Sequence, residues 1–212
     1  GTHLPDVTVI APVFDETGTV LKFFVGNRGH HADIGGLTPG STPPGSTKLE
    51  DEGGILDDVM VRDGGVFREE EVRALLADAP YPARNPDANI SDLLAQVAAN
   101  EAGIGEVYAL AARYGWDGIA AYTRHVMDNA EESVRRVIDR LTDGALTLNF
   151  DDGAELCVAV HVDREDRSAV IDFTGTSAQN PGNFNAPPAV SRAAVLYVFR
   201  CLVDEDLPLN DG

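Results

Sequence analysis

The chain has 212 residues, 43% of them hydrophobic, which is enough to bury one hydrophobic core and a small second lobe. Its 16 Lys and Arg residues face 35 Asp and Glu residues, which gives a formal net charge of −19. A surface this negative repels nucleic-acid phosphates and anionic lipid, and no apolar run reaches the roughly 20 residues of a membrane helix. We therefore expect neither a nucleic-acid partner nor a membrane partner.

The cysteine content argues against an exported, disulfide-stapled fold. The two cysteines, Cys157 and Cys201, are too few for a disulfide scaffold or a thiolate metal cage. Each lies in an apolar segment, which predicts buried free thiols. With no export signal in the sequence, a reducing cytoplasm is the expected location.

The first third of the chain predicts a β-hairpin and a long loop. Two β-rich runs, residues 6–14 and 20–26, are joined by four turn-forming residues at 15–18. Residues 35–46 are rich in Gly, Pro, Ser and Thr, which is typical of a surface linker or functional loop. We expect a further strand over 55–61 and a short helix over 68–77.

The middle of the chain predicts two long helices. Apolar residues recur at three- and four-residue spacing over 90–114 and again over 119–141. Asn89 or Ser91 is expected to cap the first helix and Asp117 the second, with Gly144 at its end. Two amphipathic helices separated by a short glycine-containing turn indicate an antiparallel helical hairpin.

Strands return after this hairpin, over 145–150, 155–162 and 168–173, and a final helix is expected from Pro187 to Val203. The predicted class is α+β, with mixed or antiparallel sheet elements flanking the helical hairpin and a C-terminal helix. We interpret residues 1–212 as part of one module, which is β-rich over 1–67, helical over 68–143, and β followed by helix over 144–212.

A cluster of histidine and aspartate residues marks the ends of the first two strands. His3 and Asp6 stand at the start of one strand, and Arg28, His30, His31 and Asp33 follow the other. Neighbouring antiparallel strands would bring these His-x-x-Asp groups to one end of the sheet. Imidazole and carboxylate ligands suit Mn, Fe or Zn. The alternative is that they are only capping and turn residues at strand ends.

A second polar cluster runs from a strand end through a loop to a helix start, over residues 172–187. Its asparagine amides and helix-start N–H groups offer a neutral site for a carboxylate or carbonyl oxygen. Ordinary turn chemistry explains the same residues. A phosphate-binding loop of the G-x-x-x-x-G-K-[ST] type, a G-x-G-x-x-G motif and a G-x-S-x-G elbow are all absent from the sequence, so nucleotide binding by those routes is rejected.

Several of these segments together resemble the hydantoinase B/oxoprolinase family, in the same order and over nearly the entire chain. They are His3-x-x-Asp6, residues 28–36, residues 39–41, residues 89–100, residues 172–175, and Asn183-x-Asn185 with the two residues that follow. The likeness is greatest to the hydantoinase B-like module of ATP-dependent 5-oxoprolinases. Relative to the family, the chain lacks the rest of the B module and the ATP-binding partner.

The resemblance implies an ATP-dependent hydrolase of cyclic amides, of the type that converts 5-oxoproline to glutamate. A hydantoinase A-like partner, fused or separate, would bind ATP and phosphorylate the carbonyl of a lactam or imide. This chain would then supply the hydrolytic half of the reaction, assisted by a divalent metal (Mn, Zn, Fe or Mg). A homo-oligomer is compatible with this scheme, and the present chain alone is expected to be inactive.

Roles for individual residues follow from the resemblance and from their chemistry. His3, Asp6, His30 and Asp33 are the candidate metal ligands. His31 is a substitute ligand or an acid–base group, and adjacent strand residues face opposite ways, so His30 and His31 are not expected to be equal ligands. Arg28 could hold a substrate carboxylate or phosphate, or else pair with an acidic neighbour. The remaining candidates are Asp172 as a catalytic group and Asn183 and Asn185 as substrate-binding groups.

Two alternatives remain open from the sequence. One is an N-methylhydantoinase-type subunit, since substrate choice depends on the shape of a pocket. The other is a non-catalytic module that uses its two long helices to dock the ATP-binding partner, with the His and Asp residues only fixing the strand ends.

Overall fold

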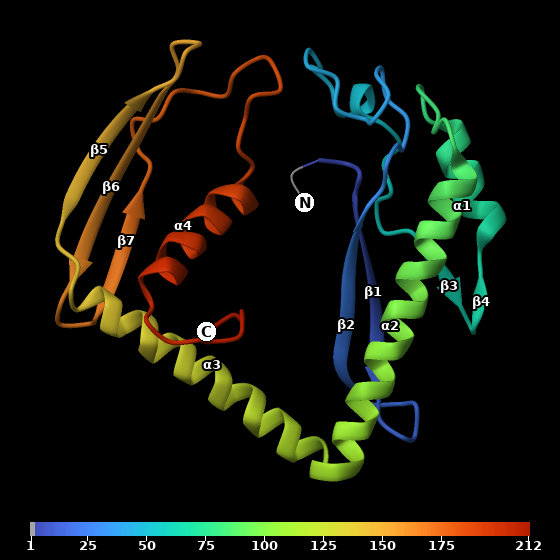
Figure 1. The fold of residues 1–212 in the computed structure, drawn as a ribbon, viewed down its shortest axis with the longest axis horizontal. Helices are drawn as coiled ribbons and strands as arrows, with labels where there is room; N and C mark the ends of the chain where they lie inside the picture. Colours follow the sequence, from blue (N-terminus) through green and yellow to red (C-terminus); the bar gives the residue numbers. More distant parts are fainter. Residues whose placement is uncertain (1–2) are drawn as a thin grey trace. The chain divides into compact units, whose positions relative to one another are not determined.

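In the computed structural model, which describes residues 3–212, the chain divides into two compact units. The first contains the residues up to Trp116 together with Pro181–Asn183, and the second contains Asp117–Asn180 and Phe184–Gly212. Figure 1 labels the elements of both units. Over the described residues, no helix combines the length and the apolar character needed to cross a membrane.

The predicted hairpin is present. Strand β1 (Asp6–Phe14) pairs antiparallel with β2 (Leu21–His30), and the carboxylate of Asp15 closes the turn by accepting the amides of Thr17, Thr19 and Val20. Strand β2 runs four residues further than predicted, to His30, because its register continues until His30 lies opposite Asp6. The start of one strand and the end of the other therefore meet at one end of the hairpin.

One face of this hairpin packs on helix α2 (Pro86–Tyr114), which runs alongside both strands in Figure 1. Helix α1 (Glu69–Asp78) completes the core of the first unit. Strand β1 contributes Val9, with Val7 packed against the core two residues earlier, and the residues from each helix recur at helical spacing, as burial of one face requires. Among the described residues, five side chains form the buried cluster. They are Val9, Val72, Leu76, Ile90 and Leu93.

The long glycine-rich segment is irregular, as predicted, apart from a short 3-10 helix, η1 (Leu49–Glu52), beyond it. Gly35 has a φ of 100°, and a Cβ there would lie 2.0 Å from the carbonyl oxygen of Tyr81, so only glycine fits. Ser41 is buried within the loop. Its hydroxyl donates a hydrogen bond to the Gly35 carbonyl and accepts one from the Ile34 amide.

The strand predicted over 55–61 is wrong. That segment has no regular structure and is bent at Asp58, whose φ is 50°, and only Val59 of this segment packs against the core. The pairing instead begins just after it, where β3 (Arg62–Asp63) and β4 (Val66–Phe67) form a two-residue ladder around Gly64 and Gly65.

The two long helices are present, but their predicted caps are not. Helix α2 begins at Pro86 and is capped by Asn85, whose side chain accepts the Ala88 amide, rather than by Asn89 or Ser91. Helix α3 (Trp116–Ile138) starts one residue before Asp117 and ends six residues before Gly144. Asn89 is instead buried, which frees it for a different role described below.

The second unit contains α3 from Asp117 onward, a three-stranded sheet and helix α4 (Pro188–Leu202). Strands β5 (Gly144–Asn149), β6 (Glu155–Asp163) and β7 (Ser168–Asp172) are antiparallel neighbours in chain order. The predicted α+β class, with small antiparallel sheets, a pair of long helices and a C-terminal helix, is confirmed. Both cysteines are free, but neither is buried, contrary to prediction.

Candidate functional site

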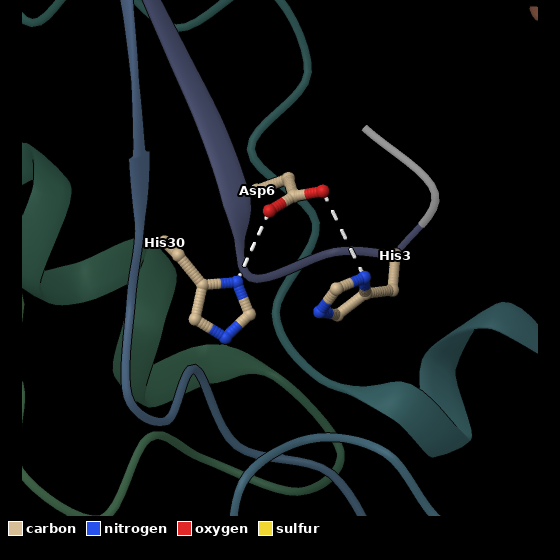
Figure 2. A group of neighbouring side chains, drawn as sticks. All are labelled: His3, Asp6 and His30. Atoms are coloured by element: carbon tan, nitrogen blue, oxygen red, sulfur yellow. Dashed lines mark hydrogen bonds and ion pairs between the residues drawn. The ribbon is translucent and has the colours of Figure 1, made fainter. Parts of the chain in front are cut away.

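His3, Asp6 and His30 converge at the end of the β1–β2 hairpin, and we call them the His–Asp–His group. The carboxylate of Asp6 lies between the two rings: one oxygen is 3.1 Å from Nδ1 of His30 and the other is 3.7 Å from Nδ1 of His3. Figure 2 shows the two rings on either side of the carboxylate. The ring centroids are 4.9 Å apart. This convergence follows from the antiparallel register that places His30 opposite Asp6.

The His–Asp–His group has the composition and access of an open metal site. Its three ligand atoms lie within 4.8 Å of one another. A zinc ion with ligands at about 2.1 Å would draw them to about 3.4 Å apart, so small side-chain rotations suffice. The His30 side chain is 59% exposed, which leaves it room to rotate. Two imidazoles and one carboxylate fit Zn, Mn or Fe and leave coordination positions open for water.

Asp33, the fourth ligand predicted from the sequence, is not part of this group. Its carboxylate accepts the amides of Gly35 and Gly40 and pairs with Arg84 at 2.7 Å. Partial burial raises the pKa of Asp33, but the hydrogen bonds from Gly40, Gly35 and Arg84 outweigh that effect and lower it overall. Asp33 therefore organises the glycine-rich loop that follows β2.

His31, a candidate acid–base group in the sequence, points away from the His–Asp–His group. Its side chain is 1% exposed and lies against α2, where one ring nitrogen is 3.1 Å from the Gln96 side chain and the other is 3.1 Å from that of Asn89. The expectation that His30 and His31 would face opposite ways agrees with this geometry, because His30 is exposed. Both ring nitrogens of His31 already have protein partners.

Arg28 lies on the same exposed face of the hairpin as Asp6 and His30. It is two residues before His30 on β2 and opposite Thr8, whose hydroxyl accepts a hydrogen bond of 3.1 Å from Nε of Arg28. No ion pair of Arg28 occurs among residues 3–212, so the pairing with an acidic neighbour considered from the sequence is not made there. The outer edge of its guanidinium is available to an anion beside the His–Asp–His group.

The residues of the second predicted cluster have hydrogen-bond partners within the chain but do not come together. Asn183 belongs to the first unit and donates to the Pro43 carbonyl at 2.8 Å, which ties it to the glycine-rich loop. Asn185 exchanges hydrogen bonds with the backbone of Asn180. The pKa of Asp172 is lowered, first by a hydrogen bond from the Thr174 hydroxyl and then by one from the Thr174 amide. Asn185 and Asp172 both lie in the second unit.

Sequence reasoning placed Asn89 at a helix cap and residues 89–100 in a family-like segment, but it missed that polar residues of α2 face the hairpin. Asn89, Gln96 and Asn100 are 2%, 7% and 2% exposed, and their side chains reach the strands. The sequence signal for these residues was their spacing. Asn89 and Gln96 are seven residues apart and Gln96 and Asn100 are four apart, which places all three on one helix face among apolar residues. Polar residues at core positions of an amphipathic helix indicate buried hydrogen bonds rather than a solvated face.

Comparison with known proteins shows sequence relatives of this chain. The family model of hydantoinase B/oxoprolinase matches residues 1–212. The 5-oxoprolinase of Saccharomyces cerevisiae is 42% identical over the whole chain, which spans 17% of that enzyme. A protein of a Pseudomonas strain that is named as a D-/L-hydantoinase subunit is 32% identical over the whole chain, which spans 38% of it.

A solved structure shares the fold. The crystal structure of the ATP-dependent caprolactamase from Pseudomonas jessenii superposes on the whole chain with a TM-score of 0.82 at 24% sequence identity, and the chain covers 36% of it. The present chain is thus equivalent to a part of each of these proteins. With a family match over its full length, this chain belongs to the hydantoinase B/oxoprolinase family.

Proposed function

We propose that this chain supplies the metal-assisted hydrolytic half of an ATP-dependent cyclic-amide hydrolase that converts 5-oxoproline to glutamate. The observation that carries the proposal is the convergence of His3, Asp6 and His30 on an exposed strand end. The 42% identity to a 5-oxoprolinase supports the choice of substrate class. ATP would be bound by a hydantoinase A-like partner, fused or separate, and not by this chain.

The proposed division of labour follows from the chemistry of the amide bond. A planar amide carbonyl is a poor electrophile, and phosphorylation of its oxygen by the partner would activate the carbon. One water would add to that carbon, the ring C–N bond would break with the nitrogen leaving as an amine, and a second water would release inorganic phosphate from the resulting acyl phosphate. A divalent ion lowers the pKa of bound water and so supplies a nucleophile near neutral pH. In this chain, Asp6 and the two histidines would hold the ion on the exposed face of the hairpin.

Arg28 is the residue of this face that we assign to substrate binding. A guanidinium forms paired hydrogen bonds with a carboxylate or phosphate, and 5-oxoproline carries a carboxylate. The Nε bond to Thr8 fixes the plane of the guanidinium and leaves its two terminal nitrogens for the substrate. Arg28 would thus orient the ring with its activated carbonyl toward the His–Asp–His group.

Metal binding by the untagged chain tests the proposal. We expect calorimetry to show binding of Mn²⁺ or Zn²⁺ to the unaltered chain, and Asp6→Asn to weaken it by more than about 100-fold, because the carboxylate is a ligand. Asp33→Asn is the matched control: it removes the same charge from a residue near the same strand but should leave metal affinity within about threefold. Absence of metal binding, or equal losses in the two variants, would refute the proposal.

The 32% identity to a hydantoinase subunit favours a second candidate substrate, a cyclic imide of the hydantoin type. The two candidates share the His–Asp–His group and differ in what Arg28 would hold. A panel of lactams and hydantoins, supplied with ATP and the ATP-binding partner, distinguishes them: turnover of 5-oxoproline in preference to hydantoins supports the first.

A further inference from the structure

An array of polar side chains lies between α2 and the end of the hairpin where the His–Asp–His group is found. Its members are Asn27, His31, Asn89, Gln96 and Asn100. Its side chains donate to the backbone carbonyls of Val7, Val9 and Asp33, and the array leaves Oδ1 of Asn89 buried without a partner among the described residues. These hydrogen bonds attach α2 to fixed points on the hairpin, so the array can set the position of the strand ends.

Backbone carbonyls fix the direction of every hydrogen bond around His31. Because a carbonyl can only accept, the Gln96 nitrogen must be the group 2.9 Å from the Val7 oxygen, and the Asn89 nitrogen must face the Asp33 oxygen. The Gln96 oxygen is therefore left to accept from Nε2–H of His31, while Nδ1 of His31 accepts from Asn89. The tautomer of His31 that satisfies both partners is therefore the one with its hydrogen on Nε2.

The same contacts join the two strands at the positions that follow the candidate ligands. Val7 comes directly after Asp6, and His31 comes directly after His30. The Gln96 side chain bonds to both Val7 and His31, and the carbonyl of Pro5 accepts the amides of the same two residues at 2.9 and 2.8 Å. These two residues are thus tied to each other once through α2 and once through the backbone.

We propose that Gln96 is a positioning residue for the His–Asp–His group: by holding Val7 and His31 together it sets the separation of Asp6 and His30. Gln96 touches neither substrate nor metal in this scheme and acts only through the two strands. The inference deepens the proposed function and rests on it for its metal readout, while its effect on the strands can be measured without metal.

The test compares Gln96→Met with Asn100→Leu in the untagged chain. Met keeps the length of Gln but forms none of its hydrogen bonds. Asn100 lies one helical turn further along α2. It donates to the Val9 carbonyl and accepts from the Asn27 side chain, and neither Val9 nor Asn27 adjoins a candidate ligand. Both variants lose buried hydrogen bonds and should melt at lower temperature. Only Gln96→Met should weaken Mn²⁺ binding, by about 10- to 100-fold, the range typical of groups that orient metal ligands.

Amide hydrogen exchange provides the readout without metal. In Gln96→Met, the amides of Val7 and His31 should exchange about tenfold faster, the factor that corresponds to one ordinary hydrogen bond. In Asn100→Leu, exchange at these two amides should stay close to that of the unaltered chain. A general loss of stability would change both variants alike.

A milder pair of variants serves if Gln96→Met does not fold. A Cβ on Gly29 would lie 2.9 Å from the Gln96 amide carbon, so Gly29→Ala should displace that amide, whereas a Cβ on Gly26 meets only ordinary contacts at 3.6 Å. Gly29→Ala should weaken Mn²⁺ binding about tenfold, the lower end of the range expected for a disturbed ligand-orienting group, and Gly26→Ala should not.

The outcomes separate the two proposals. Unchanged exchange and Mn²⁺ affinity in both Gln96→Met and Gly29→Ala, or equal losses in the Gln96 and Asn100 variants, would overturn the positioning role and leave the proposed function standing. If the unaltered chain binds neither Mn²⁺ nor Zn²⁺, the metal site is refuted. Faster exchange at Val7 and His31 in Gln96→Met would then still show that Gln96 holds the two strands together.

Discussion

Replacing Asp6 with alanine should abolish lactam hydrolysis in the enzyme assembled with its ATP-binding partner. Asp6 is the shared neighbour of both histidines, and its loss would leave two imidazoles with no carboxylate between them. Because a metal contributes several kcal/mol to such a reaction, the rate should fall on the order of a thousandfold. The measurement is glutamate release from 5-oxoproline with ATP in excess.

ATP hydrolysis in the same assay is the internal control. In the proposed scheme the carbonyl is phosphorylated before water attacks, so ATP consumption should continue in part while glutamate release stops. Arg84→Gln provides a matched variant, since it disturbs the loop through Asp33 but not the His–Asp–His group. Full lactam hydrolysis by Asp6→Ala would contradict the account. A parallel loss of ATP hydrolysis and lactam hydrolysis, in a variant whose circular dichroism matches that of the unaltered chain, would contradict it as well.

Leu93→Ala should lower the free energy of unfolding of the first unit far more than a substitution on the exposed face of α2. The Leu93 side chain is 1% exposed and belongs to the core that joins α2 to β1 and α1. Truncation of a buried leucine costs about 3 kcal/mol through lost burial and the cavity left behind. The single tryptophan, Trp116, lies in the first unit and reports on its urea unfolding by fluorescence.

Leu94→Ala is the paired control, because Leu94 is the next residue on the same helix and is 45% exposed. Its loss should cost less than about 1 kcal/mol, as expected for a partly exposed leucine. Equal unfolding midpoints for the two variants would show that the face of α2 assigned to the core is not the one that stabilises this unit.

The β1–β2 hairpin and the meeting of His3, Asp6 and His30 could be predicted because they depend on local signals. Alternating apolar residues and a compact turn define the strands, and an antiparallel register then fixes which ends meet. The helices were also predictable, since their apolar spacing extends over many turns. The cap of α2 was predictable in principle, because Asn85 followed by Pro86 is a better capping signal than Asn89.

The role of each polar residue near the site could not be predicted in this way. Spacing placed Asp33 beside the histidines, but its carboxylate is satisfied by Gly35, Gly40 and Arg84, and Arg84 is 51 residues away in the sequence. His31 is equally dependent on distant partners, Asn89 and Gln96 on α2. The sequence does not show which of two adjacent histidines is buried, because that depends on the side of the hairpin against which α2 packs.

Anomalous X-ray diffraction from crystals of the chain grown with Zn²⁺ tests the central claim most directly. The account predicts an anomalous peak at the end of the β1–β2 hairpin, about 2.0–2.2 Å from a nitrogen of His3, a nitrogen of His30 and a carboxylate oxygen of Asp6. A zinc ion bound elsewhere, or none at this strand end while Asp6 keeps its contacts to both rings, would contradict it.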